Sequence, residues 1–264
     1  MKRIEGRRTI EEEYRPFLSD ESRLSPEPVE RLYFPETTDE AAEAVRECAE
    51  SGTTVVFSGG RTGITGGAVP REAGAIVSTE RLELEPEVGI DPVTGGWTIR
   101  IGAGTTLAEI KDILARKSYR APEEAQGKRF FFPVDPTETG AALGGMAATN
   151  ASGARTLGYG PMRDWVAGLT VVLADGSITR LRRGSRAEAA AEVSTGGSVR
   201  LPLEPDAAEG PGAAARYREI PAAAVDIPEG KHSGGYYLRP PFEAVDLFVG
   251  SEGTLGLITE LELR

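Results

Sequence analysis

The chain has 264 residues, of which 39% are hydrophobic and 27% are charged, a composition typical of a folded globular protein. It carries 41 acidic against 30 basic residues, and this acidic balance argues against nucleic acid or an anionic membrane surface as the main partner. A single cysteine and a single histidine exclude an intrachain disulfide, a four-cysteine cluster and a histidine-rich metal site, so no metal is expected. Neither a signal-peptide core nor an apolar run of bilayer length is present, and a reducing cytoplasm is therefore the expected location.

Strands and helices are expected to alternate in the first half of the chain. Residues 37–52 and 105–117 predict two amphipathic helices. Cys48 falls on the apolar face of the first helix, which indicates a core residue. The helices begin with the capping boxes Thr37–Glu40 and Thr106–Glu109. Apolar runs predict strands at 31–34, 53–57, 73–78 and 97–104.

The second half is less regular. Residues 130–168 are rich in glycine, alanine, proline and aromatic residues and show little periodicity. Residues 165–181 predict a β-hairpin with Asp175-Gly176 at its turn. Residues 182–230 are interpreted as an exposed excursion, with a short helix over 185–192, and the chain resumes to finish on a strand. The late hairpin favours an α+β fold over a doubly wound parallel sheet.

Residues 55–70, VVFSGGRTGITGGAVP, place a run of glycines directly after an expected strand. A Walker A loop requires a lysine and then a helix, and neither follows Gly67. A Rossmann fingerprint is excluded because the glycine spacing differs and no helix opens there. Two interpretations remain open: a series of tight turns, or a set of backbone amides that face a ligand.

Three further stretches have the same composition, namely residues 133–140, 144–160 and 250–256. Each combines glycine with small hydroxyl or amide residues and has almost no lysine nearby. Each alone is typical of turns. Together they indicate that an acidic protein holds an extended anionic cofactor through oriented backbone amides, without the help of cationic side chains.

These blocks resemble the FAD-dependent oxidoreductases with a PCMH-type, vanillyl-alcohol-oxidase-like flavin domain. SGGRTGITGGAVP is similar to the family's pyrophosphate loop, the block from FPVDPTETG to VVLADG to its second motif, and DLFVGSEGTLGLITE to its third. The branch with glycolate oxidase FAD subunits and D-lactate dehydrogenases is the most similar. The resemblance runs from about residue 30 to the end, apart from 182–230.

The resemblance implies one FAD-binding domain over 1–264 with a two-subdomain α+β fold. The first subdomain would span about 30–125 and the second 126–264, with 182–230 as a loose insertion. FAD would lie extended between them, and the C-terminal substrate domain of the family would be absent from this chain.

Carried over by motif, the resemblance assigns cofactor contacts to three groups of residues. The pyrophosphate would be held by the amides of Gly59, Gly60, Arg61, Thr62 and Gly63. Asp135, Pro136, Thr137, Gly144, Gly145, Thr149, Asn150, Ala151 and Ser152 would form a wall along the cofactor. Glu252, Gly253 and Ile258 would lie along the flavin from the other side.

Two departures from the family pattern bear on the chemistry. Arg61 stands where a third consecutive glycine is common, so its amide is expected to point inward while its guanidinium reaches solvent or a phosphate oxygen. The histidine that sometimes binds flavin covalently is missing from the loop, which implies non-covalent FAD. His232 is interpreted as a surface or capping residue.

In function, the resemblance implies oxidation of a D-2-hydroxy acid of the glycolate or D-lactate type by hydride transfer to flavin N5. The catalytic residues are unknown and are expected in the missing domain, because the base and the carboxylate-binding cations lie there in the family. A partner chain supplying that domain or an electron acceptor is therefore a further expectation. The alternatives are a flavin-binding or electron-transfer module, or a split-enzyme subunit, without substrate turnover of its own; a related NADPH-dependent reductase fits the 250–256 block poorly.

Overall fold

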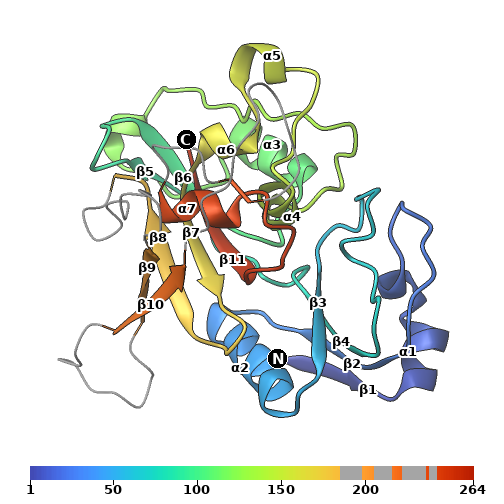
Figure 1. The fold of residues 1–264 in the computed structure, drawn as a ribbon. Coiled ribbons are helices and arrows are strands. Elements are labelled where there is room, and N and C mark those ends of the chain that lie inside the picture. The colour runs from blue at the N-terminus through green and yellow to red at the C-terminus, as the bar shows by residue number, and fades with distance from the viewer. Residues whose placement is uncertain (185–197, 205–215, 222–235, 238–242) are drawn as a thin grey trace.

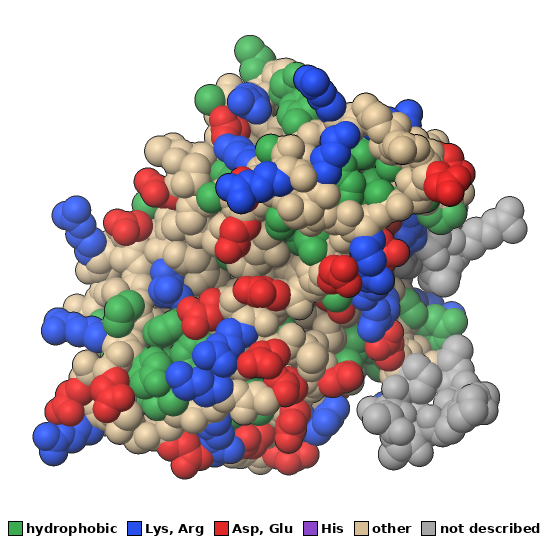
Figure 2. Space-filling view, turned by 180° about the vertical axis from the view of Figure 1, so that it is seen from behind, with side chains coloured by type: hydrophobic (Ala, Val, Ile, Leu, Met, Phe, Trp, Pro, Cys, Tyr) green, Lys and Arg blue, Asp and Glu red, His purple; other side chains and the backbone are tan. Residues whose placement is uncertain are grey.

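The computed structural model describes residues 1–184, 198–204, 216–221, 236–237 and 243–264, arranged around two β-sheets (Figure 1). The expected helix over 185–192 and His232 lie outside these residues. On the face shown in Figure 2, acidic and basic side chains are interspersed, and hydrophobic side chains form small separate groups.

The first sheet has four strands in the order β1-β2-β4-β3. Strands β2 and β3 both run parallel to the central β4, whereas β1 pairs antiparallel with β2. The strands are β1 (Lys2–Glu5), β2 (Val29–Phe34), β3 (Thr54–Ser58) and β4 (Gly74–Ser78). One face of this sheet packs on α1 (Arg7–Glu13) and the 3-10 helix η1 (Arg15–Leu18), through Ile10 and Leu18.

The second sheet has five antiparallel strands in the order β5-β6-β11-β7-β8. They are β5 (Glu87–Ile90), β6 (Trp97–Gly102), β7 (Val166–Val172), β8 (Ile178–Arg182) and β11 (Leu257–Leu263). The remaining elements are α3 (Leu107–Arg116), η2 (Glu123–Ala125), α4 (Leu143–Ala148), α5 (Thr156–Tyr159), α6 (Met162–Trp165), α7 (Ala244–Phe248) and the hairpin β9 (Ser198–Leu203) with β10 (Arg216–Pro221). Leu107 and Ile110 of α3 and Leu143 of α4 join the main core of this sheet.

Helix α2 (Thr38–Glu50) joins the two sheets. Its alanine-rich face and Cys48 pack against Tyr33 and Val77 of the first sheet and also contact Val172 and Leu257 of the second. The hydroxyl group of Thr38 in α2 and that of Thr259 in β11 of the second sheet lie 2.9 Å apart and are buried. The core is therefore continuous from one sheet to the other through α2.

The α+β prediction is confirmed, since each expected strand and both long helices are present within two or three residues of their predicted limits. The capping box of α3 is complete, with the Glu109 carboxylate accepting from the Thr106 amide at 2.7 Å. The box predicted for α2 forms only by half: the Thr37 hydroxyl accepts from the Glu40 amide, but the Glu40 carboxylate accepts from Glu36 N.

Three features differ from the sequence prediction. The N-terminal elements β1, α1 and η1 were not expected, nor was the hairpin β9–β10 inside 182–230. Strand β5 pairs with β6, and β6 pairs with β11, so both strands belong to the five-stranded sheet. The chain therefore passes from the first sheet to the second between β4 and β5.

Candidate functional site

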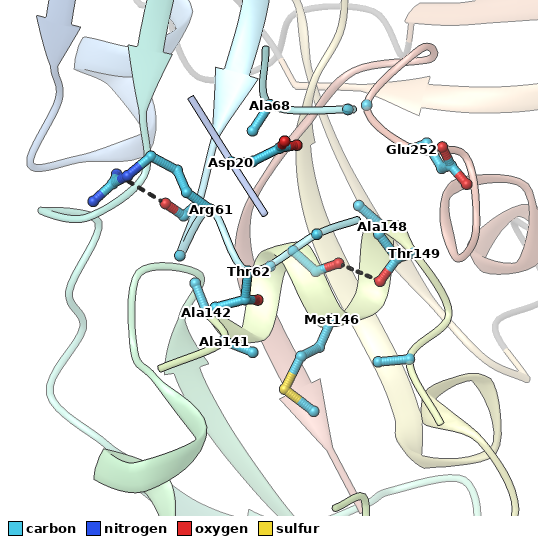
Figure 3. A pocket seen from close by; sticks show the side chains of 18 of the residues that line it. Asp20, Arg61, Thr62, Ala68, Ala141, Ala142, Met146, Ala148, Thr149 and Glu252 are labelled. Carbon is cyan, nitrogen blue, oxygen red and sulfur yellow. Dashed lines mark hydrogen bonds between the residues drawn. The ribbon is translucent and has the colours of Figure 1, made fainter. Parts of the chain in front are cut away.

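A cavity of about 890 Å³ lies between the two sheets, beside the end of β3 in the first sheet and the start of β11 in the second. Its volume falls within the range of about 300–1,000 Å³ that is usual for ligand sites. Three parts of the wall are residues 57–68, 136–152 and 252–258, and Asp20 and Glu21 close a fourth side (Figure 3). The glycine-rich blocks thus converge on one cavity.

The loop after β3 presents unpaired backbone amides. Among the backbone and side-chain hydrogen bonds of the described residues, none has an amide of residues 59–65 as its donor. Amide groups held together in this way form a concave site for an anion, because several N–H dipoles point at it without a cationic side chain. This loop is therefore able to bind a phosphate group.

Glycines bring backbone to backbone along this loop and leave space at its partner segment. A Cβ on Gly60 would overlap the carbonyl of Gly140, so the loop lies directly on the chain before α4. A Cβ on Gly145 would meet nothing within 4 Å. Since Gly145 lines the cavity, that open space belongs to the ligand site.

Helix α4 forms in a stretch where the sequence shows little periodicity. Its first amides, of Leu143 and Gly144, donate to the carbonyls of Thr105 and Ala103 at 2.8 and 3.0 Å. A Cβ on Gly144 would lie 2.7 Å from the Ala103 Cβ. This glycine therefore permits the close contact between α4 and the residue that follows β6. Tertiary hydrogen bonds therefore define this helix and place its exposed side along the cavity.

Arg61 takes a left-handed backbone conformation, with φ of 57°. Its guanidinium lies 4.3 Å from the centre of the Phe17 ring and donates to Gly59 O at 3.1 Å (Figure 3). Burial lowers the pKa of this guanidinium. Its partners among the described residues are the aromatic ring of Phe17 in η1 and a carbonyl of its own loop, and the expected contact with solvent or a phosphate oxygen stays a prediction.

Two of the expected contact residues do not line the cavity. Asp135 forms an ion pair with Lys111 at 2.5 Å, and this hydrogen bond lowers the pKa of its carboxyl. Asn150 accepts a hydrogen bond from Arg163 N at 3.0 Å and so holds α6 in place. Both side chains thus have structural partners outside the cavity lining. All the other residues carried over from the resemblance do line it.

The segment after α7 forms the opposite wall. Gly250 N and Glu252 N donate to the carbonyls of Ala147 and Ala148 at 3.0 and 2.8 Å, so this segment caps the end of α4. Glu252 has φ of 52°, a conformation that glycine usually supplies. The strained position holds the Glu252 backbone against the cavity.

Several lining residues were not predicted. Most follow directly from the quoted motifs, because they are neighbours of the named residues in the same loops; Asp20 and Glu21 have no motif in the sequence that marks them. The additional lining residues are Asp20, Glu21, Phe57, Ile64, Thr65, Gly67, Ala68, Thr79, Glu138, Ala141, Ala142, Met146, Ala148, Gly256 and Leu257.

The side-chain charge of the cavity is acidic. Its wall includes Asp20, Glu21, Glu138 and Glu252, and among the described lining residues Arg61 is the only cationic one. No histidine is among them. Within the described part of the chain no group of three or more His, Cys, Asp or Glu side chains is arranged to hold a metal ion. An anionic ligand would depend on backbone amides.

A family model described as "FAD binding domain" matches residues 29–182 of the chain. The chain belongs to this FAD-binding family. It is 32% identical to a D-lactate dehydrogenase of Archaeoglobus fulgidus, over 87% of this chain and 37% of that protein. It is 29% identical to the glycolate oxidase subunit GlcD of Bacillus subtilis, over 86% of this chain and 34% of that protein. The chain thus spans about a third of the length of these curated relatives.

Solved structures confirm the fold of the FAD-binding chain. The 6-hydroxy-D-nicotine oxidase of Arthrobacter nicotinovorans superposes with a TM-score of 0.61 at 14% identity, over the whole of this chain and 41% of that one. A chitooligosaccharide oxidase gives 0.57 at 17% identity, over 95% of this chain and 38% of that one. The two-sheet arrangement is therefore the PCMH-type FAD-binding fold.

The cavity fits the family's cofactor, FAD. Its volume suits an extended dinucleotide, the free amides of 59–65 suit a pyrophosphate, and the open space at Gly145 admits a group close to the backbone. None of the helices in the described part of the chain combines the length and apolar character that crossing a membrane requires.

Proposed function

We propose that the chain is the FAD-binding portion of an oxidoreductase that oxidises a D-2-hydroxy acid of the glycolate or D-lactate type. The observation that carries this proposal is the cavity of about 890 Å³, with its unpaired amides, in a chain whose relatives are named for such hydroxy acids. Bound FAD would supply a hydride acceptor at flavin N5. We propose that the FAD is held without a covalent bond and that the protein is cytoplasmic.

Residues of this chain bind and orient the cofactor. The amides of 59–63 would hold the pyrophosphate, the wall from Pro136 to Ser152 would follow the cofactor, and Gly253 and Ile258 would lie beside the flavin. Met146 and Leu257 provide apolar surface within the same cavity, which excludes water from part of it.

The protein groups that act on the substrate would come from outside the described cavity. Oxidation of a hydroxy acid requires a base for the hydroxyl proton and a cation for the carboxylate. The described lining has no histidine, and its one guanidinium is bound to Gly59 O and Phe17. We therefore propose that further sequence of the same protein or a partner chain supplies these groups.

The test begins with the purified chain titrated with FAD. We expect a yellow complex with the absorbance bands of oxidised flavin, released intact by denaturation because no covalent bond forms. Adding D-lactate, glycolate or D-2-hydroxyglutarate without oxygen should leave the bands unchanged until the substrate-binding portion is present, and should then bleach them. A folded chain that binds no FAD would overturn the proposal.

An electron-transfer module without substrate turnover is the second candidate, and the lack of a described base in the cavity favours it. It predicts that chemical electron donors reduce the bound flavin, while every hydroxy acid leaves it oxidised even when the substrate-binding portion is present.

A further inference from the structure

The N-terminal segment supplies part of the cavity wall, although it precedes the residues that the family model matches. Phe17 carries the Arg61 guanidinium on its ring. Leu24 lies so close to Gly66 that a Cβ there would overlap its side chain. Residues 17–24 therefore contact the loop that presents the free amides near both of its ends.

Asp20 extends from this segment toward the cavity (Figure 3). Its Oδ1 accepts hydrogen bonds from the amide and the hydroxyl of Ser22, the first at 2.9 Å. Its Oδ2 is buried and has no hydrogen-bond partner among the described residues. A carboxylate is an acceptor only, and buried polar atoms are almost always paired, so this oxygen requires a donor.

The position of Oδ2 restricts what that donor can be. A Cβ placed on Gly63 would lie 4.0 Å from Asp20 Oδ2, so the carboxylate adjoins the loop proposed to hold the pyrophosphate. The pyrophosphate itself is an anion and cannot donate. The nearest donors in FAD are the hydroxyl groups of the two sugar units joined to the pyrophosphate, the ribose and the ribityl chain.

We propose that Asp20 Oδ2 accepts a hydrogen bond from a sugar hydroxyl next to the pyrophosphate, which makes Asp20 a specificity-determining residue for the cofactor. The carboxylate would then favour a ligand that carries a hydroxyl there over one that presents only phosphate. This inference deepens the proposed function and rests on it.

The first measurement compares the wild-type chain with Asp20→Asn, which keeps the shape of the side chain and removes its charge. Flavin fluorescence quenching gives the FAD affinity, and circular dichroism gives the melting temperature of the cofactor-free chain. We expect the affinity for FAD to fall about tenfold, because the one amide oxygen keeps the hydrogen bonds from Ser22 and the amide nitrogen at the Oδ2 position cannot accept one. The melting temperature should stay equal or rise, because an unpaired buried charge is removed.

A loss of FAD affinity without a loss of melting temperature distinguishes a residue that contacts the cofactor from one that only supports the fold. Glu13→Gln on α1 is the matched control, since Glu13 is exposed and is not among the cavity lining residues, and both quantities should keep their wild-type values. If Asp20→Asn lowers affinity and melting temperature together, or binds FAD as tightly as wild type or more tightly, the inference is overturned.

Fragments of the cofactor identify the sugar. A loss of affinity shared by FAD and ADP but not FMN assigns the ribose hydroxyl, and a loss shared by FAD and FMN but not ADP assigns the ribityl hydroxyl. A wild-type chain that binds no FAD overturns the proposed function and this inference with it, whereas a wild-type complex that Asp20→Asn leaves unaltered overturns the inference alone.

Discussion

At the scale of single residues, two non-glycine positions of the cavity adopt a left-handed backbone, Arg61 and Glu252. This conformation costs a non-glycine residue about 1–2 kcal/mol. For Arg61 the contact with Phe17 offsets a similar amount, since a cation over an aromatic ring contributes about 0.5–2 kcal/mol. The sequence shows that Arg61 departs from the family's glycine pattern. It does not show that Phe17 lies against Arg61, because that contact depends on how the N-terminal elements pack.

Gly145 and Gly60 make a matched pair for a residue-scale prediction. Gly145→Ala should leave the cofactor-free chain as stable as wild type, or up to about 1 kcal/mol more stable, because alanine favours a helix and its Cβ meets no protein atom. The same methyl group occupies cavity space, so FAD affinity should fall at least tenfold. Urea denaturation and a FAD titration measure the two effects.

The control is Gly60→Ala, whose Cβ overlaps the Gly140 carbonyl. It should destabilise the cofactor-free chain by about 1–3 kcal/mol, the usual result of overpacking. Wild-type FAD affinity in Gly145→Ala would show that the cofactor does not approach this residue.

At the scale of elements, helices that are specified by their own sequence could be predicted, whereas helices that depend on tertiary contacts could not. Helices α2 and α3 carry capping residues and apolar periodicity in their own sequence, so they could be predicted. Helix α4 begins on hydrogen bonds to Thr105 and Ala103 and has no capping side chain of its own. Helix α7 carries a capping box, Glu243 with Asp246, but it is only five residues long, and buried arginines hold it in place. The same difference explains Asn150: its motif position was correct, but its side chain partners Arg163.

Asp246 of α7 joins this helix to α6 and to the residue that follows β8. It lies between Arg163 and Arg183, with oxygen-to-nitrogen distances of 3.0 and 2.6 Å, and its side chain is only 5% exposed. Burial opposes its ionisation, but the hydrogen bonds from Arg183 and Arg163 outweigh burial and hold the pKa of Asp246 below its ordinary value. The ion pairs therefore favour the folded chain.

Asp246→Asn should lower the free energy of unfolding by about 3–5 kcal/mol near neutral pH, because the buried guanidinium of Arg163 loses its counter-charge and that of Arg183 keeps only Glu243. A carboxyl with a lowered folded pKa stabilises fully above its unfolded pKa of about 3.9 and loses this contribution as the pH falls through the folded value. The difference between variant and wild type should thus shrink below about pH 4. Urea denaturation across this pH range measures it.

Asp112→Asn provides the comparison, since Asp112 forms an exposed pair with Arg116 within α3. Such pairs contribute at most about 0.5 kcal/mol. An Asp246→Asn variant as stable as Asp112→Asn at neutral pH would contradict the role given to the buried pairs.

At the scale of the whole molecule, the cavity lies where the two sheets meet, and α2 and the Thr38–Thr259 contact already connect them. The sequence predicted both sets of strands and the cofactor loops, but it could not show where the chain passes from one sheet to the other. That point depends on β11, which pairs with strands more than eighty residues earlier in the chain.

Since FAD would contact both sheets, its binding should stabilise the chain as one unit. At about 100 times the dissociation constant, FAD should add about 2.7 kcal/mol to the free energy of unfolding. For a chain of this size that corresponds to a rise of roughly 5–10 °C in melting temperature. Circular dichroism melts with and without FAD measure it. Two separate transitions, of which FAD shifts only one, would show that the sheets unfold independently.

The place of β11 also has a kinetic consequence. This strand is synthesised after both of its neighbours, yet it lies between β6 and β7 in the finished sheet. Until it inserts, each neighbour exposes an unpaired edge, and long-range pairing of this kind is slow and prone to aggregation. Leu257 and Ile258, which line the cavity, arrive with the same strand. Capture of the cofactor should therefore be among the last events of folding, and FAD added during refolding should raise the yield of native protein by trapping the closed sheet.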